Sequence, residues 1–118
     1  MDDDRIWAFE DSLWRADAQH YHDAIDAECL MVIAAPPYIM TGMEAADVVS
    51  KTPRWSTVEF SEQRVSRPQT GLIVIAYRVL AAKEEASPYD ARCTSVYHKT
   101  DADTWTVVQH QQSPVLAD

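Results

Sequence analysis

The sequence is poor in several residues that particular functions require. Its 118 residues include only two glycines, which leaves no room for a glycine-rich phosphate-binding loop. Its two cysteines, Cys29 and Cys93, lie far apart in apolar, strand-like contexts, so we expect buried free thiols in a reducing cytoplasm rather than a disulfide framework. No apolar run approaches the roughly 18 residues of a membrane span. The N-terminus has no basic segment followed by an apolar one, so no signal peptide is expected.

Basic residues are also scarce. The chain has 10 Lys and Arg against 19 Asp and Glu, which gives a net charge of −9. Nucleic acids and anionic membrane surfaces attract basic patches, so the sequence predicts neither as a partner. Hydrophobic residues make up 47% of the chain, which favours a single folded domain over residues 1–118 rather than disorder.

The first half of the chain has helical signals. Asp2–Asp4 offers an N-cap before apolar residues at helical spacing, and Asp17 offers another before a short second helix. Thr41 and Glu44 have the spacing of a capping box, which predicts a third helix over about 42–51.

The second half alternates with the period of two that strands require. An early strand over 28–34 is expected to be too apolar for exposure on either face, and 72–82 to be central in the sheet. The remaining predictions are strands over 55–67, 89–100 and 104–113, with a hairpin turn at 101–103. The predicted fold class is α+β, with three N-terminal helices packed on one face of a strongly curved, mainly antiparallel sheet.

This order of elements resembles the nuclear transport factor 2-like superfamily, whose fold is also called cystatin-like. The residues that carry the likeness are Trp7 and Trp14 in the first helix, Asp17 before the second, and the closing segment 103–114. The nearest resemblance is to its SnoaL-like branch of domains of unknown function, near the calcium/calmodulin-dependent kinase II association domain. It implies a conical pocket between helices and sheet, and a homodimer formed through the sheet. Because the superfamily holds isomerases, dehydratases, epoxide hydrolases and assembly domains, the fold alone identifies no reaction.

The acid–base patterns of the superfamily are not reproduced here. Its ketosteroid-isomerase-like members place a general-base carboxylate in or just after the first strand, where this chain has the acid-free segment 29–35. Epoxide-hydrolase-like members need an Asp–Arg–Asp set, and the strands after residue 68 carry no carboxylate except Asp90. His20 and His22 cannot share a helix face as a metal pair. We therefore predict neither a metal site nor a cofactor.

His110 is the main candidate for chemistry. A histidine is the usual proton shuttle near neutral pH, and strand alternation places His110 on one face with Val108 and Gln112. Trp105 and Val107 take the opposite face, so only one of the two sets is expected to face the helices. We expect the His110 set to line the pocket, although Trp105 could equally be the inward anchor. The alternative role for His110 is structural, as a hydrogen-bonded link between strand and helices.

Tyrosines and arginines supply the other candidates. Tyr77 and Tyr97 could polarise a carbonyl, with Tyr97 as the catalytic partner of His110, or could simply fill the core. Arg78 and Arg92 could bind a carboxylate ligand or lie on the outer face, paired with Glu59 or Glu62. The predicted pocket lining is Trp14, Tyr21, Met31, Phe60, Tyr77, Val108 and Gln112.

Three functions remain open. The first is a small-molecule-binding domain with an apolar, cone-shaped pocket, and the second is a small lyase or isomerase that uses His110 as base with a tyrosine donor. The third is a homo-oligomeric assembly domain. The first is favoured because no acid–base pair is visible. A homodimer through the sheet is also expected, because the strand over 72–82 is apolar on the face that no helix can cover.

Overall fold

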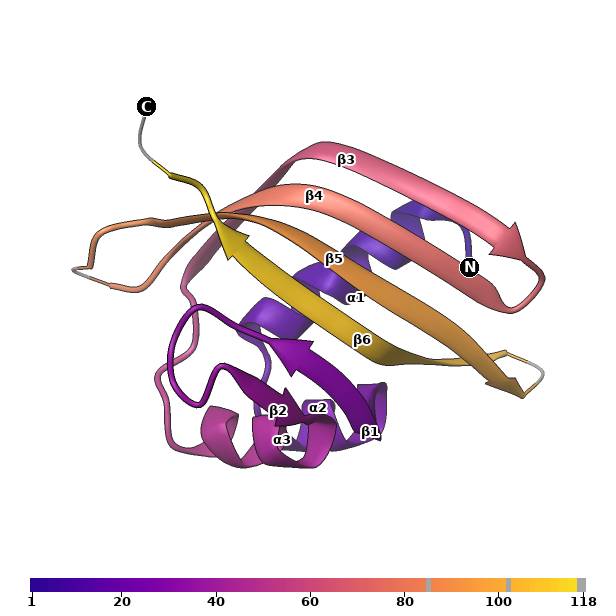
Figure 1. The fold of residues 1–118 in the computed structure, drawn as a ribbon, viewed down its shortest axis with the longest axis horizontal. Helices are drawn as coiled ribbons and strands as arrows, with labels where there is room; N and C mark the ends of the chain where they lie inside the picture. Colours follow the sequence, from indigo (N-terminus) through magenta and orange to yellow (C-terminus); the bar gives the residue numbers. More distant parts are fainter. Residues whose placement is uncertain (85, 102, 117–118) are drawn as a thin grey trace.

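The computed structural model describes residues 1–84, 86–101 and 103–116. Three helices pack against one curved sheet, in which the strand order is β2-β1-β6-β5-β4-β3 (Figure 1). The elements are α1 (Asp3–Arg15), α2 (Ala18–Ala24), β1 (Ile25–Val32), β2 (Ile39–Thr41), α3 (Gly42–Ser50), β3 (Thr57–Gln69), β4 (Leu72–Ala82), β5 (Tyr89–Asp101) and β6 (Thr104–Pro114). No described helix is both long and apolar enough to cross a membrane.

The sheet is mixed and open. Strands β3 to β6 pair antiparallel in succession, whereas β1 runs parallel to β6 and antiparallel to the short edge strand β2. Helix α1 crosses behind the long strands, and α2 and α3 lie beside β1 and β2 (Figure 1). The predicted α+β class, with three helices on one face of a mainly antiparallel sheet, is confirmed.

The three predicted helix caps are present. The Asp2 side chain accepts a hydrogen bond from the backbone of Arg5 at 2.8 Å, and that of Asp17 accepts one from the backbone of His20 at 3.1 Å. Thr41 and Glu44 form both bonds of the capping box, at 3.2 and 3.1 Å. Each cap side chain accepts a hydrogen bond from a backbone N–H that the start of a helix leaves unpaired. These local signals therefore predicted the helix starts correctly.

Two expectations about the early strands were wrong. Strand β1 begins at Ile25 rather than residue 28, and it is not buried on both faces, since Leu30 is 58% exposed. Strand β2 was not predicted, because three residues after Pro36–Pro37 are too few to display a period. Residue 102 of the predicted hairpin turn lies outside the described residues.

The last strand contains a β-bulge that reverses its alternation. Val107 pairs with Tyr97 on β5, whereas Gln109 pairs with Val96, the residue directly before Tyr97. Two steps along β6 therefore match one step along β5, and Val108 is the extra residue. Trp105 and Val107 therefore point toward the helices before the bulge, and His110 does so after it; all three are buried. The expectation that His110 and Trp105 lie on opposite faces was wrong, because strict alternation holds only in an unbulged strand.

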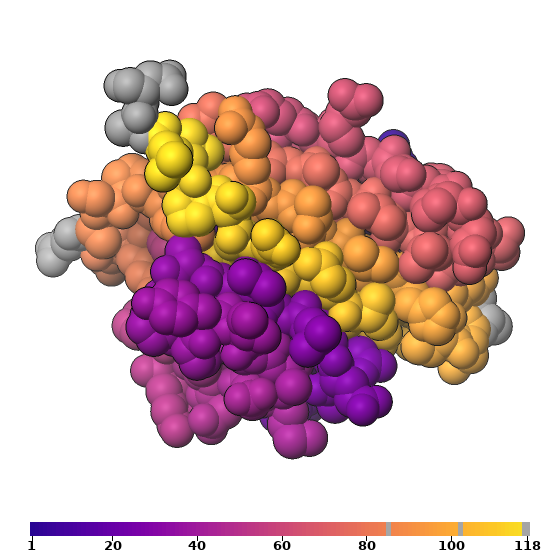
Figure 2. Space-filling view, viewed as in Figure 1, coloured from indigo at the N-terminus to yellow at the C-terminus, as the bar shows by residue number. Residues whose placement is uncertain are grey.

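The outer face of the sheet carries an ion-pair network. Nε and Nη2 of Arg78 donate to the Asp90 carboxylate, at 2.9 and 2.7 Å, and Glu62 accepts from Nη1 of Arg78 and from Arg92. This is the outer-face alternative predicted for the two arginines, with Glu62 rather than Glu59 as the partner. Figure 2 shows this broad strand face without any helix over it.

Candidate functional site

A cavity of about 430 Å³ lies between the helices and the inner face of β1 and β6. This volume is within the range of small-molecule sites, roughly 300–1,000 Å³. Most of its wall is apolar, including Leu13, Ile25, Met31, Ile33, Met40 and Val107. Its polar side chains include Glu10, Tyr21, Arg54, Lys83, Tyr89, His110 and Gln112.

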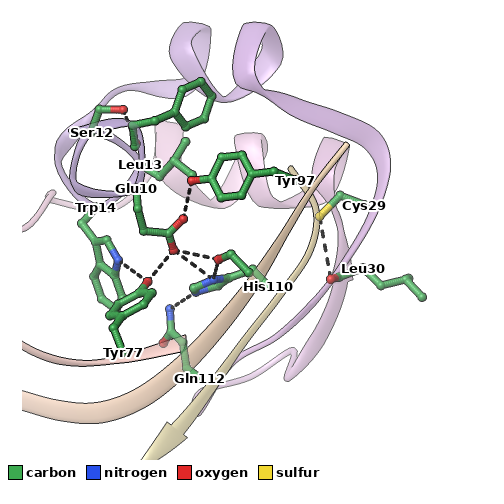
Figure 3. Close-up of polar contacts among 12 residues, drawn as sticks. Glu10, Ser12, Leu13, Trp14, Cys29, Leu30, Tyr77, Tyr97, His110 and Gln112 are labelled. Carbon is green, nitrogen blue, oxygen red and sulfur yellow. Dashed lines mark hydrogen bonds and ion pairs between the residues drawn. The ribbon is translucent and has the colours of Figure 1, made fainter. Parts of the chain in front are cut away.

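A buried carboxylate forms the centre of one polar cluster (Figure 3). Glu10 on α1 is 0% exposed, and its Oε2 accepts hydrogen bonds from the hydroxyls of Tyr77 at 2.5 Å and Ser95 at 2.7 Å. Its Oε1 accepts from the Tyr97 hydroxyl at 2.5 Å. Three hydroxyls from β4 and β5 thus take the place of the water that a buried carboxylate would otherwise need.

The same cluster fixes the tautomer of His110. Ser95 Oγ lies 2.7 Å from His110 Nδ1, and because Ser95 gives its only proton to Glu10, Nδ1 must donate to Ser95. Nε2 of the neutral ring is then an acceptor, and the Gln112 amide lies 3.2 Å from it. The Gln112 carbonyl accepts from the Tyr89 hydroxyl at 3.0 Å. Hydrogen bonds therefore run in one direction, from Gln112 through His110 and Ser95 to Glu10.

Burial sets the protonation of the cluster. It lowers the pKa of His110, although the Glu10 charge acts in the opposite direction. It also raises the pKa of Tyr77 and of Tyr97, and the Glu10 charge adds to both shifts, so both phenols remain donors. Burial likewise raises the pKa of the Cys93 thiol to about 12, which leaves no thiolate nucleophile there at neutral pH.

A second polar group lies on another part of the cavity wall. Arg54 Nε donates to the carbonyl of Ala16 at 2.8 Å, and Nη2 donates to the carbonyl of Leu13 at 2.6 Å and to the Tyr21 hydroxyl at 3.2 Å. Tyr21 in turn donates to the Leu13 carbonyl at 2.8 Å. Arg54 therefore binds the open carbonyls at the end of α1, where a cation is favoured, while its side chain also lines the cavity.

The predicted site residues divide into two groups. His110, Trp14, Tyr21, Met31 and Gln112 all line the cavity. They come from α1, α2, β1 and β6, so the fold brings together residues up to about 100 positions apart in the chain.

The other predicted residues are not part of the cavity lining. Phe60 packs against Tyr77, with ring centroids 4.5 Å apart. The hydroxyls of Tyr77 and Tyr97 both donate hydrogen bonds to Glu10. Val107 occupies the lining position expected for Val108, because the bulge shifts the alternation there. Tyr97 is therefore a support for Glu10 rather than a group facing the cavity.

The sequence analysis missed several site residues, including Arg54, Tyr89 and Ser95, and the most central of them is Glu10. The buried stripe of α1 consists of Ile6, Glu10, Leu13 and Trp14, which stand at positions i, i+4, i+7 and i+8. A carboxylate within an otherwise apolar stripe was the available signal, because a buried charge requires partners. Its partner residues, on β4, β5 and β6, gave no local indication of the contact.

Family comparison agrees with this architecture. The sequence matches the model of the SnoaL-like domain over residues 5–117. The chain belongs to the SnoaL-like domain family. Comparison of this SnoaL-like domain with curated proteins gave no match.

Several solved structures are similar to this SnoaL-like domain. An NTF2-like protein from Cytophaga hutchinsonii has a TM-score of 0.79 at 16% identity, with 98% of this chain and 100% of that chain covered. A candidate ketosteroid isomerase from Parabacteroides distasonis has a TM-score of 0.75 at 17% identity, covering 93% and 85%. The association domain of C. elegans CaMKII has a TM-score of 0.66 at 15% identity, covering 92% and 88%. At these identities the likeness shows the NTF2-like fold alone, as the sequence resemblance predicted.

The state of His110 leads to a pH prediction. Since burial lowers its pKa in the folded protein, the unfolded chain binds the proton more readily, and stability should fall as the pH drops below about 6.5. One proton can contribute a slope of at most about 1.4 kcal/mol per pH unit. Urea unfolding between pH 5.5 and 8 measures this slope. The His110→Gln variant should have a flatter profile, and an unchanged slope would contradict this origin.

Proposed function

We propose that this SnoaL-like domain binds a small, mainly apolar molecule in the cavity between its helices and sheet. The observation that carries the proposal is the cavity itself, about 430 Å³ with a largely apolar wall and a few convergent polar groups. Small-molecule sites typically have this composition.

The hydrogen bonding of the Glu10 cluster supports binding over catalysis. A general base must reach a substrate proton with a free lone pair. The Glu10 oxygens already accept from three protein hydroxyls, and both ring nitrogens of His110 have protein partners. We infer that the cluster holds His110 and Gln112 in fixed orientations as a polar part of the binding wall.

A neutral apolar dye tests the proposal. N-phenyl-1-naphthylamine, whose fluorescence rises when it leaves water, should bind saturably with one site per chain. Val48→Phe should weaken this binding at least severalfold, because Val48 lines the cavity. Val74→Phe adds the same ring on the outer face of β4 and is the matched control. Equal dye binding by the two variants would place the dye elsewhere and contradict the proposal.

A lyase or isomerase that uses His110 as base is the second candidate. The observation in its favour is that Nε2 of the neutral ring is an acceptor on the cavity wall, and its one hydrogen-bond partner among the described residues is the partly buried Gln112 amide. A ligand O–H or C–H could take the place of that amide. The tyrosine nearest to this role is Tyr89, whose hydroxyl donates to Gln112, rather than Tyr97. Catalysis predicts that His110→Gln abolishes turnover while dye binding persists.

We also propose that the chain forms a homodimer through the outer face of the sheet. Solved neighbours include CaMKII association and hub-homology domains, and on this chain the outer face exposes apolar side chains such as Leu80, which is 43% exposed. Light scattering should give twice the 13.4 kDa mass of one chain at micromolar concentration. Leu80→Glu should shift the mass toward one chain, whereas Leu116→Glu, at an 84% exposed position, should not. A parent mass near 13.4 kDa would contradict the dimer.

A further inference from the structure

The charges that line the cavity differ in sign from the chain as a whole. The sequence has 19 acidic residues and 10 basic ones, yet Glu10 is the only carboxylate among the described residues that line the cavity. Two basic residues, Arg54 and Lys83, line it as well. Two cations against one carboxylate give the lining a net positive charge, and the Glu10 oxygens already accept from three protein hydroxyls.

Arg54 has donors that the protein leaves open. Its Nε and Nη2 bind two carbonyls and one hydroxyl, all of them neutral acceptors. Within the described part of the chain, Nη1 donates no hydrogen bond, and Arg54 forms no ion pair with a carboxylate within 4 Å. Nη1 therefore keeps N–H donors from which a ligand carboxylate can accept a charge-assisted hydrogen bond, while Nε and Nη2 stay on the two carbonyls and the hydroxyl.

An aromatic wall adjoins Lys83, and the Arg54 guanidinium lies 5.4 Å from the centre of the Tyr21 ring. The Trp55 and Tyr89 rings are stacked with centroids 5.7 Å apart, and the Trp14 ring lies 5.9 Å from that of Trp55. Lys83 Nζ is 4.7 Å from the centre of the Trp55 ring. All four rings line the cavity, so an apolar surface and positive charge are next to each other.

We propose that the molecule bound in the cavity is an amphiphilic carboxylic acid, whose apolar body lies in the cavity and whose carboxylate binds Arg54. This inference rests on the proposed binding function and names its ligand class. The role of Arg54 at the end of α1 explains its Nε and Nη2 bonds, but it explains neither the open Nη1 nor the exclusion of every other described carboxylate from the lining. The alternative is that Arg54 only binds the carbonyls at the end of α1 and recognises no ligand, and the experiment distinguishes the two.

Three probes with the same eight-carbon chain test the head group. Octanoate, 1-octanol and octylamine are used at pH 7.5 to displace N-phenyl-1-naphthylamine from the parent protein. A charge-assisted hydrogen bond to Arg54 should make octanoate at least about tenfold more effective than 1-octanol, with octylamine weakest. If the dye binds but 1-octanol displaces it as well as octanoate does, acid recognition is overturned while the binding function stands. Failure of the dye to bind overturns the binding function itself.

Variants assign the preference to Arg54. Arg54→Gln should lose the tenfold preference for octanoate over 1-octanol, a ratio taken within one variant and therefore independent of any change in its dye affinity. Arg15→Gln is the matched control, because Arg15 also donates to two backbone carbonyls, of Ser56 and Val58, but does not line the cavity. A preference retained in Arg54→Gln would overturn the assignment.

The parent protein provides a second readout if Arg54→Gln does not fold. Attraction between a carboxylate and a half-exposed guanidinium weakens with ionic strength. The ratio of octanoate to 1-octanol affinity should therefore fall between 20 and 500 mM NaCl. A ratio that does not change with salt would overturn the proposal.

Discussion

Replacing Glu10 with leucine should lower the free energy of unfolding by about 3–5 kcal/mol. The leucine would leave the buried hydroxyls of Tyr77, Ser95 and Tyr97 without their acceptor, and each such hydroxyl costs roughly 1–3 kcal/mol. Removing the desolvated charge offsets part of the sum, since a buried carboxylate is itself costly. Urea unfolding followed by far-ultraviolet circular dichroism measures the change.

Two companion variants separate the hydrogen bonds from the charge. Tyr97→Phe removes one donor and keeps the ring, so it should cost only about 1–2 kcal/mol. Asp4→Leu removes an exposed carboxylate from the same helix and should change stability by less than about 1 kcal/mol. If Glu10→Leu is as stable as Asp4→Leu, the hydroxyls have other partners and Glu10 does not organise the cluster.

The features that the sequence predicted well have local causes. The cap at Asp17 and the capping box at Thr41 and Glu44 involve residues three apart, so the pattern contains both partners. The strand at 72–82 also matches β4 residue for residue, because its apolar run ends at clear turn and loop signals on both sides. These elements, with their order, were sufficient to predict the α+β class and the NTF2-like resemblance.

The site depended on contacts that no local pattern contains. Glu10 and His110 are 100 positions apart, and their carboxylate and imidazole are 3.6 Å apart with Ser95 bridging them. The sequence supplied His110 and, on the same strand face, its partner Gln112, but it named Tyr97 as the catalytic partner and gave neither Ser95 nor Glu10. The bulge at Val108 is likewise a property of the pairing between β5 and β6, and a count of alternating residues along β6 cannot reveal it.

The bulge has an energetic consequence at Trp105, because it allows this residue to face the core on the same strand as His110. Trp105 is 9% exposed and belongs to the buried cluster that includes Tyr97 and Val107. Truncating a large aromatic side chain in a packed core costs about 3–5 kcal/mol. Trp105→Ala should therefore lower the free energy of unfolding by that amount, which is a large part of the total for a small domain.

Thermal and urea unfolding followed by circular dichroism check the Trp105 prediction without relying on tryptophan fluorescence. Trp105→Phe keeps an aromatic ring in the core and should cost clearly less than Trp105→Ala, because a smaller cavity remains. Leu116→Ala removes an exposed apolar side chain and should stay within about 0.5 kcal/mol of the parent. If Trp105→Ala melts within a couple of degrees of the parent, the side chain is not packed, and the inward placement of both halves of β6 around Val108 is wrong.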